Sequence, residues 1–129
     1  MPVEYRDAPT LAPPAGYSHV AVAPAETLVL TAGAVPIDAD GNVVAPDDPA
    51  AQADVVLDHL VVALETGGAS PADVLKTTVY VVGGHAAQVA VWDVVRASTV
   101  GRAPSTLLGV SSLGYRGQVV EIEATAVTS

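Results

Sequence analysis

Two segments with helical periodicity, each lying between strand-like segments, constrain the fold of this chain most strongly. In the first segment apolar side chains recur at helical spacing, at Ala53, Val56, Leu57, Leu60 and Leu64. Residues 85–99 carry a second stripe of this kind. Because a helix that joins two strands of one sheet makes a right-handed crossover, both helices are expected on the same face of the sheet. The sequence therefore predicts an α+β fold, with a mixed β-sheet that has one covered face and one uncovered face.

Local signals place the boundaries of these elements. Asp48 and Pro49 are typical of a helix N-cap and first helical position, and Gly67-Gly68 ends the pattern. Gln52 falls outside the apolar stripe. Strands are expected at residues 17–23, 27–36, 74–82, 105–110 and 118–127, and the first two are expected to form an antiparallel hairpin. Residues 1–16 carry four of the ten prolines, which indicates an extended lead-in to a single domain spanning residues 1–129.

The last strand shows which residues the uncovered face would carry. By alternation Val120, Ile122, Ala124 and Ala126 share one side, while Glu121 and Glu123 share the other. If the apolar set meets the helices, two carboxylates line the uncovered face. The core must be built mainly from Val, Leu and Ala, since the chain has no Phe and one Trp. Small side chains bury little area each, so association of subunits over the uncovered face is favoured.

Charge and composition exclude several classes of function. A formal charge of -9 lacks the basic surface of a nucleic-acid-binding protein. The absence of cysteine excludes disulfides, a thiol nucleophile and a thiolate metal site. The three histidines, His19, His59 and His85, do not have the spacing of a zinc motif, so no metal site is expected. His19 is the histidine most suited to face a pocket, because it lies on an expected strand.

The start of the chain contains no basic segment followed by an apolar run, and the longest apolar runs are interrupted by Asp54, Asp58 and His59. We therefore expect no signal peptide and no membrane contact, and a cytoplasmic protein.

Three stretches have the composition of a binding or catalytic site. Glu121 or Glu123 would be able to order a water molecule, or either would be a hydrogen-bonded interface carboxylate. Gly83-Gly84 precedes a helix, which suits either an anion-binding turn or a plain one. In GRAPSTLLGV, residues 101–110, an arginine and two hydroxyl groups stand where a loop becomes a strand. That stretch suits a carboxylate-binding site, and it is also an ordinary way to begin a strand.

Several motifs together resemble a known family. The series GYSHV, LTAGAVP, AAQADVVLDHLVVALETGGASPADVLKTTVYVV, RAPSTLLGV and GQVVEIEATAV is similar to the RidA/YjgF/UK114 family of reactive-intermediate deaminases, also labelled endoribonuclease L-PSP. The similarity extends from about residue 14 to residue 128. The resemblance implies a chorismate-mutase-like fold, assembled as a homotrimer around a central barrel with a pocket at each subunit interface. It also implies hydrolysis of enamines and imines, such as 2-aminoacrylate, to 2-keto acids and ammonia, without a metal or organic cofactor.

The resemblance also assigns candidate site residues. Tyr17 and Gly33 match pocket positions of the family, and Glu121 matches the glutamate that orients the attacking water. The family's substrate-binding arginine falls on Ser105, with Thr106 next to it. A serine cannot make the bidentate charged contact that an arginine makes with a carboxylate. Arg102 is a candidate replacement.

Arg116, in the final turn, is a second candidate for that replacement. The alternative is that the pocket accepts a different ligand, held by Ser105, Thr106 and Tyr17.

Two hypotheses for function follow, from different classes. The first is a hydrolase that acts on a small imine or enamine, with Glu121 as the catalytic residue and a substrate altered by the change at position 105. The second is a non-catalytic protein that binds a small metabolite in the interface pocket. A third, endoribonuclease or translation inhibitor, is attached to the family's name and is disfavoured by the charge of -9.

Overall fold

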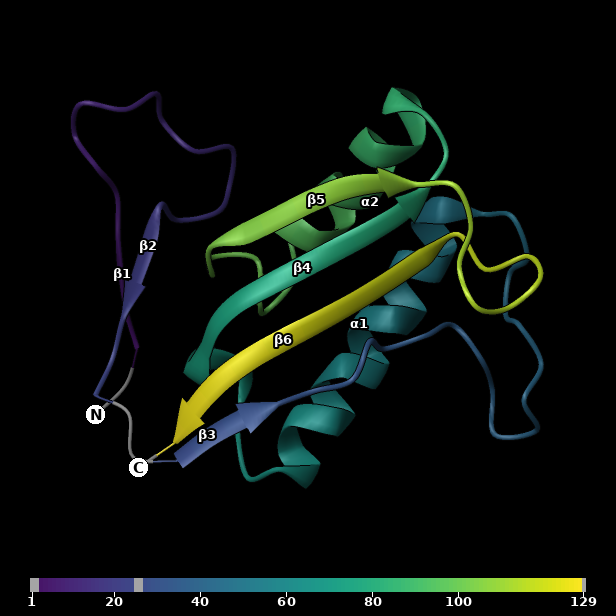
Figure 1. Cartoon of the computed structure of the whole chain (residues 1–129), viewed down its shortest axis with the longest axis horizontal. Helices are drawn as coiled ribbons and strands as arrows, with labels where there is room; N and C mark the ends of the chain where they lie inside the picture. The colour runs from purple at the N-terminus through teal and green to yellow at the C-terminus, as the bar shows by residue number, and fades with distance from the viewer. Residues whose placement is uncertain (1–2, 25–26, 129) are drawn as a thin grey trace.

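The computed structural model describes residues 3–24 and 27–128, and it contains two helices packed against a sheet. In chain order the elements are β1 (Glu4–Arg6), β2 (Val20–Val22), β3 (Thr27–Leu30), α1 (Pro49–Thr66), the 3-10 helix η1 (Pro71–Asp73), β4 (Val74–Val82), α2 (His85–Arg96), β5 (Ser105–Val110) and β6 (Val120–Thr128). Four strands form the main sheet, and β1 and β2 form a separate two-stranded ribbon at one end of the molecule (Figure 1).

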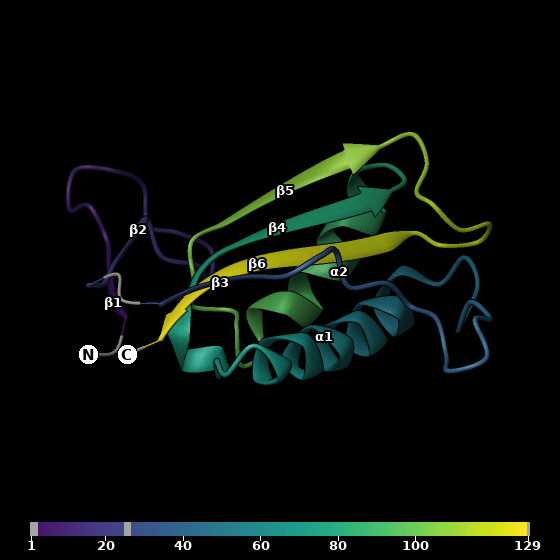
Figure 2. The same ribbon diagram turned by 60° about the horizontal axis from the view of Figure 1, so that its bottom comes forward.

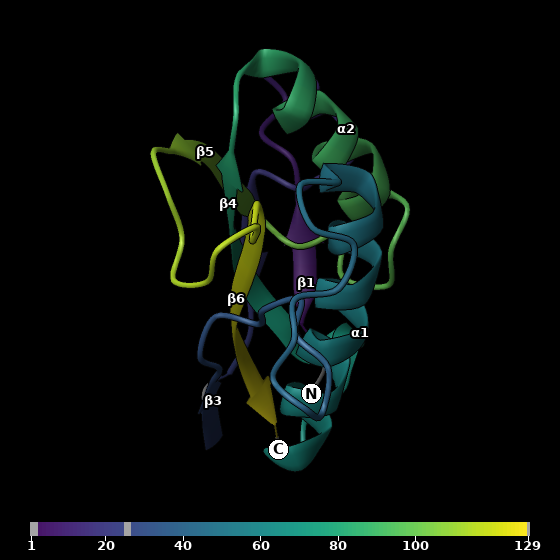
Figure 3. The ribbon, with the colours of Figure 1, turned by 90° about the vertical axis from the view of Figure 1, so that its right-hand side faces the viewer.

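The main sheet is mixed, with the strand order β3-β6-β4-β5. β6 runs antiparallel to both of its neighbours, and β5 runs parallel to β4 because α2 carries the chain back between them. Both helices lie on the same face of this sheet, as the views in Figure 2 and Figure 3 show. The expectation of an α+β fold with one helix-covered face is therefore confirmed.

The ends of the helices follow the local sequence signals. The side chain of Asp48 accepts a hydrogen bond from the backbone N–H of Ala51, and Pro49 occupies the first turn of α1. At the other end Gly68 adopts a φ of 83°, a conformation that favours glycine. The Ser70-to-Asp73 capping box is also present at η1. Among the described residues, neither helix is both long enough and apolar enough to cross a membrane.

The core lies between the helices and the covered face of the sheet. The alternation expected for the last strand is confirmed, because Val120, Ile122, Ala124 and Ala126 are all buried there. Opposite them lie the apolar side chains of α1 and α2, including Leu60, Leu64, Val91 and Val95. The other face carries Glu121 and Glu123, and no element covers it among the described residues (Figure 3).

Gln52 is a buried exception to the apolar stripe of α1. Its amide nitrogen donates to the carbonyl oxygens of Val44, Ala45 and Gly117, and its amide oxygen accepts from the backbone N–H of Val119. The helical pattern leaves Gln52 outside the stripe, but the side chain turns inward because two loop segments supply partners for both ends of its amide. One side chain thus joins α1 to the loop that precedes it and to the loop between β5 and β6.

The expected hairpin between residues 17–23 and 27–36 is wrong. β2 pairs instead with β1, with Tyr5 opposite Ala21, and β3 pairs with β6, with Val29 opposite Ala126. The connection between β2 and β3, residues 23–26, contains none of the Gly or Asn residues that tight hairpin turns use. The lead-in thus includes a short strand, and the Tyr5 hydroxyl ties it to the sheet by donating to the carbonyl oxygen of Val74 at 2.6 Å.

Candidate functional site

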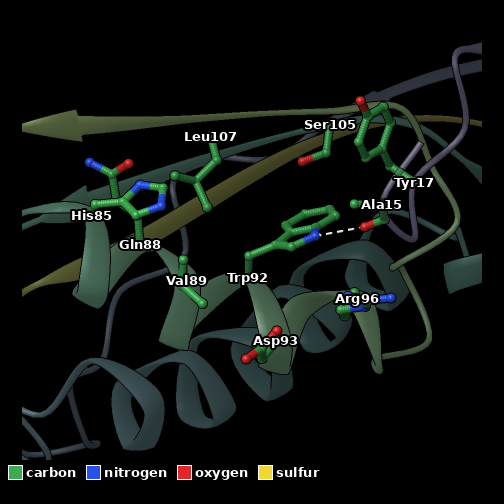
Figure 4. Close-up of a pocket in the computed structure, with 10 residues that line it drawn as sticks. All are labelled: Ala15, Tyr17, His85, Gln88, Val89, Trp92, Asp93, Arg96, Ser105 and Leu107. Carbon is green, nitrogen blue, oxygen red and sulfur yellow. Dashed lines mark hydrogen bonds between the residues drawn. The ribbon is translucent and has the colours of Figure 1, made fainter. Parts of the chain in front are cut away.

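A cavity of about 510 Å³ lies between α2, the start of β5 and the loop that precedes β2 (Figure 4). Its volume is in the range that small-molecule sites occupy. The residues that line it are Ala15, Tyr17, His85, Gln88, Val89, Trp92, Asp93, Arg96, Ser105 and Leu107. Segments far apart in the sequence therefore meet here, because α2 crosses from the end of β4 to the edge strand β5.

Trp92, the single tryptophan of the chain, fixes one wall of this cavity. Its indole N–H donates to the carbonyl oxygen of Ala15 at 2.7 Å, and its ring meets the ring of Tyr17 edge-on with centroids 6.0 Å apart. Gly16, which separates Ala15 and Tyr17 in the chain, has a φ of 95°, and a Cβ at this position would lie 2.9 Å from Cβ of Arg96. The loop can approach α2 this closely only because position 16 has no side chain.

Ser105 supplies a neutral hydroxyl group to the cavity. It lies opposite Thr77 in the parallel pairing of β4 and β5, and the buried Thr77 hydroxyl donates to the Ser105 oxygen at 2.8 Å. The lone pair of Ser105 that faces Thr77 is thereby used, which leaves its own proton for a ligand.

Gln88 brings a second neutral polar group to the other end of the cavity (Figure 4). A Cβ at Gly109 would lie 2.5 Å from the amide nitrogen of Gln88, so the glycine makes room for this side chain on β5. The amide nitrogen also lies 3.5 Å from the carbonyl oxygen of Gly83. The double glycine at positions 83 and 84 therefore forms the turn into α2, where Gly84 is the N-cap residue.

A second group of candidate residues lies on the uncovered face of the sheet. After β3 the chain follows the edge of β6, where the N–H of Ala34 donates to the carbonyl oxygen of Ile122 at 2.7 Å. This contact sets Gly33 against the side chain of Glu121, and a Cβ at position 33 would lie 2.6 Å from Cδ of Glu121. Glycine at position 33 is thus a requirement of the position that the carboxylate takes.

Gln118 holds the carboxylate of Glu121 from the other side. Its buried amide nitrogen donates to Oε1 of Glu121 at 3.1 Å and to the carbonyl oxygen of Val120 at 3.0 Å. Its amide oxygen accepts from the backbone N–H of Tyr115 at 3.2 Å, which fixes the orientation of the amide. Glu121 is therefore oriented by two neighbours and keeps Oε2 for another partner.

Two further contacts occupy the polar groups beside Glu121. The Tyr80 hydroxyl donates a short hydrogen bond to Glu123. This bond, together with partial desolvation and the negative charges of Glu123 and Glu121, raises the pKa of Tyr80. Next along the face, the ammonium group of Lys76 donates to the Thr106 hydroxyl at 2.7 Å. Glu123 and Thr106 thus have partners within the chain.

The candidate residues therefore form two groups. Tyr17 and Ser105 lie together in the cavity, and Gly33 and Glu121 lie together on the uncovered face. In the strand register, Ser105 on β5 pairs with Thr77 on β4. Tyr80 lies three residues further along β4 and pairs with Glu121 on β6, the neighbour of β4 on its other side. Standard sheet spacings put the two groups about 14 Å apart, on opposite faces of the sheet.

The three remaining candidates lie outside the cavity. Thr106 is next to Ser105 but faces the other way, toward the side of the sheet that carries Glu121. Arg102 does not line the cavity; its positive charge opposes the rise that burial causes in the pKa of Tyr5. Arg116 lines a separate cavity of about 320 Å³ that also contains Gln118. Neither arginine lines the cavity that contains Ser105 in the described part of the single chain.

Other side chains at these two places were not foreseen from the sequence. Gln88 and Arg96 line the cavity, and the only available signal for Trp92 was its being the single tryptophan of an otherwise aromatic-poor chain. His85 lines the cavity, whereas the ring of His19 accepts from the N–H of Ala8 at 2.9 Å and helps to fold the lead-in loop.

The described residues contain no cluster of three or more His, Cys, Asp or Glu arranged to hold a metal ion.

The comparisons with known proteins give a consistent family. The family model described as Endoribonuclease L-PSP matches residues 7–128. YyfB of Yersinia pestis, a Rid-family protein of unknown function, is 31% identical, with 99% of this chain and 100% of that one covered and a TM-score of 0.90. Among curated proteins none matches the sequence.

Two other solved structures are similar to the chain over nearly its whole length. Rv2704 of Mycobacterium tuberculosis, from the YjgF/YER057c/UK114 family, is 28% identical, with 98% of this chain and 99% of that one covered and a TM-score of 0.65. The YjgF gene product of E. coli is 26% identical, with 97% and 94% covered and a TM-score of 0.65. The TM-score is much higher for YyfB although the covered shares are similar.

Proposed function

The chain belongs to the Rid/YjgF family, and from this membership and the placement of Glu121 we propose that it hydrolyses a small imine or enamine to a carbonyl compound and ammonia. The observation that carries the proposal is the carboxylate of Glu121, held between Gly33 and Gln118 on the uncovered face, whose Oε2 has no hydrogen-bond partner among the described residues. A carboxylate fixed in this way is suited to ordering a water molecule for attack on a C=N carbon.

The reaction needs little from the protein beyond this. An enamine first gains a proton at carbon and becomes the imine. The water oxygen then bonds to the imine carbon while the nitrogen takes up a proton, and Glu121 accepts a proton from the water. Return of that proton to the nitrogen makes ammonia the leaving group. The hydroxyl group releases its proton to solvent as the C–N bond breaks, which balances the proton first taken up by nitrogen, so that R₂C=NH and water yield R₂C=O and ammonia. The chemistry requires an oriented water and a positioned substrate.

The two groups of residues are brought into one site only by a neighbouring subunit, and we propose that the chain assembles as the trimer typical of the family. The cavity of one subunit would then face Glu121 of the next. Support comes from the uncovered face itself, where Leu28 and Leu30 are exposed on β3, since apolar side chains gathered on one face mark a surface for association. A monomer by light scattering at micromolar concentration would contradict this assembly.

Substrate binding is assigned in the same way. Tyr17 and Ser105 bind the substrate within the cavity, while Thr106 and Gly33 belong to the half of the site that carries Glu121. We assign no role to Arg102, because it does not line the cavity that contains Ser105. Arg116, which shares a cavity with Gln118, is the closer candidate for a charged contact.

The direct test is ammonia release from imines generated in situ by flavin-dependent amino-acid and amine oxidases. The chain should accelerate ammonia release, and Glu121→Gln should reduce that acceleration roughly 100-fold or more because the water loses its oriented base. The matched control is Glu123→Gln on the same strand face, whose partner is Tyr80; it should keep most of the activity. Equal losses in both variants, with folding intact by circular dichroism, would refute the role of Glu121.

The Ser105→Arg variant separates the hydrolase from a non-catalytic binding protein. Restoring the family's arginine should raise activity toward imines that carry a carboxylate, because a guanidinium group makes a bidentate contact with it. If the wild-type chain and Ser105→Arg are both inactive toward every imine, the chain is the non-catalytic metabolite-binding protein instead.

A further inference from the structure

The interior of the cavity is neutral, and its charged residues are confined to the rim. Tyr17, Gln88, Trp92, Ser105 and Leu107 are the half-buried lining residues, and none of them carries a charge. The three ionisable residues of the lining other than Tyr17, namely His85, Asp93 and Arg96, are all exposed. A ligand that enters the cavity therefore leaves water for neutral surroundings.

The one arginine of the lining is held away from Ser105. The side chain of Arg96 packs along the backbone of Gly16, with its Nε 3.2 Å from where a Cβ of that glycine would lie. Figure 4 shows its guanidinium group at the end of the cavity, below Ala15, with the indole of Trp92 between it and Ser105. Asp93, one turn earlier on α2, brings a charge of opposite sign to the same rim.

The shape of the interior suits a flat group. The Trp92 ring is fixed by its bond to Ala15 and by its edge contact with Tyr17, and Leu107 lies across the cavity from it (Figure 4). Aromatic rings stack favourably on a fixed indole, and Leu107 and Val89 add apolar contact. The Ser105 hydroxyl, whose oxygen already accepts from Thr77, is placed to donate to an acceptor on the ligand.

We propose that this cavity binds a neutral ligand with a planar aromatic or heteroaromatic group, which stacks on Trp92 and accepts a hydrogen bond from Ser105. The substrate is then an aromatic imine or enamine without a carboxylate at the reacting carbon, and this second statement rests on the proposed function. A carboxylate in the same place would lose its water and gain only neutral donors.

The single tryptophan allows binding to be measured without any reaction. The probes are benzamide and benzoate, which share a ring and differ in charge, and the readouts are Trp92 fluorescence and the indole N–H cross-peak in a ¹H–¹⁵N spectrum of the full chain. Benzamide should give a saturable change in both readouts, and the affinity for benzoate should be lower by about tenfold or more. Benzoate binding as tight as benzamide, or tighter, would overturn the proposal, as would the absence of benzamide binding.

Variants locate the site. Val89→Phe should fill the cavity and weaken benzamide binding about tenfold, while the same change at the exposed Val62 on α1 should leave it unchanged. Ser105→Ala should weaken binding roughly fivefold through loss of one neutral hydrogen bond. Arg96→Gln should have no effect, and loss of binding in this variant would show that a cation anchors the ligand and overturn the proposal.

A matched pair of imines keeps this inference apart from the proposed function. A flavin amine oxidase converts benzylamine to a neutral imine, and an amino-acid oxidase converts phenylglycine to the corresponding imine with a carboxylate. Faster ammonia release from the neutral imine is expected. If benzamide binds at Trp92 but neither imine is accelerated, the hydrolase proposal fails and the binding inference stands. If the carboxylated imine is preferred, the binding inference fails and the hydrolase proposal stands.

Discussion

The two faces of the main sheet are built from the same strands but are finished differently. On the covered face, β4 and β6 contribute Val79, Val81, Val120 and Ile122, all fully buried against the helices. On the uncovered face the same two strands carry Tyr80, Glu121 and Glu123. The first face is complete within one chain. The second presents an oriented carboxylate beside exposed leucines, and no described element of the same chain packs against it.

The difference shows that stability and chemistry are separated by the alternation of the strands. Neighbouring residues of a strand point in opposite directions, so a substitution on one face leaves the side-chain contacts of the other face unchanged. Variants of the covered face should therefore change the free energy of unfolding, and variants of the uncovered face should change association and activity.

The largest expected effect on the free energy of unfolding comes from comparing a leucine that faces the core with a leucine on the uncovered face. Leu60 on α1 is fully buried, so Leu60→Ala should lower the free energy of unfolding by about 3 kcal/mol through lost contacts and a residual cavity. Leu30 on β3 is 69% exposed, so Leu30→Ala should lower it by roughly 0.5 kcal/mol or less at concentrations where the chain is dissociated. Urea denaturation followed by circular dichroism measures both. Similar losses would mean that the two faces are not separated.

Gln52 gives the next largest effect. Gln52→Ala should lower the free energy of unfolding by about 2 kcal/mol, because buried backbone groups of Val44, Gly117 and Val119 lose their partner. The control is Gln88→Ala, whose amide makes a single long contact at a half-buried position and should cost much less. The urea concentrations at the unfolding midpoint compare the two variants, provided that the dependence of the free energy of unfolding on urea concentration is the same in both. A Gln52→Ala variant as stable as wild type would contradict this account.

The smallest effect concerns the bond between the β1–β2 ribbon and the sheet. Tyr5→Phe should lower the free energy of unfolding by about 1 kcal/mol at neutral pH, because the hydroxyl no longer donates to Val74. Burial raises the pKa of Tyr5 despite the nearby charge of Arg102. The folded form therefore loses this proton at higher pH than the unfolded form.

It follows that the contribution of Tyr5 is fully present below the ordinary tyrosine pKa, about 10, and is lost as pH rises through the folded-state value. Wild type should lose stability above about pH 10, and Tyr5→Phe should lose less over the same range. The exposed Tyr115 supplies the control, since Tyr115→Phe should keep the alkaline decline of wild type. An unchanged decline in Tyr5→Phe would show that Tyr5 is not its source.

The parts of the fold that follow from periodicity could be predicted from the sequence. The stripe of α1, its Asp48 cap and the alternation of β6 are local patterns, and the structure confirms each of them. The pairing of the first strands is not local. It depends on whether residues 20–22 meet β1 or β3, and the deciding contact, Tyr5 with Val74, joins residues 69 positions apart.

The candidate site divides in the same way. Glu121 and Gly33 stand in the motifs that carry the family resemblance, and the structure places the two residues in contact. The roles of Gln118 and Trp92 were not predicted, because they depend on hydrogen bonds to backbone groups that only the folded chain brings within reach. Arg102 is close to Ser105 in the sequence, but it does not line the cavity that contains Ser105.

The loop formed by residues 7–19 gives the cavity one of its walls, through Ala15 and Tyr17. Surface loops accept substitutions and changes of length more readily than the elements of a core. The ligand preference of this protein can therefore drift during evolution through one loop, while the sheet and the carboxylate of Glu121 stay as they are. Relatives with the same scaffold are then expected to differ first in this loop, and screening its sequence variants is a direct way to change what the protein accepts.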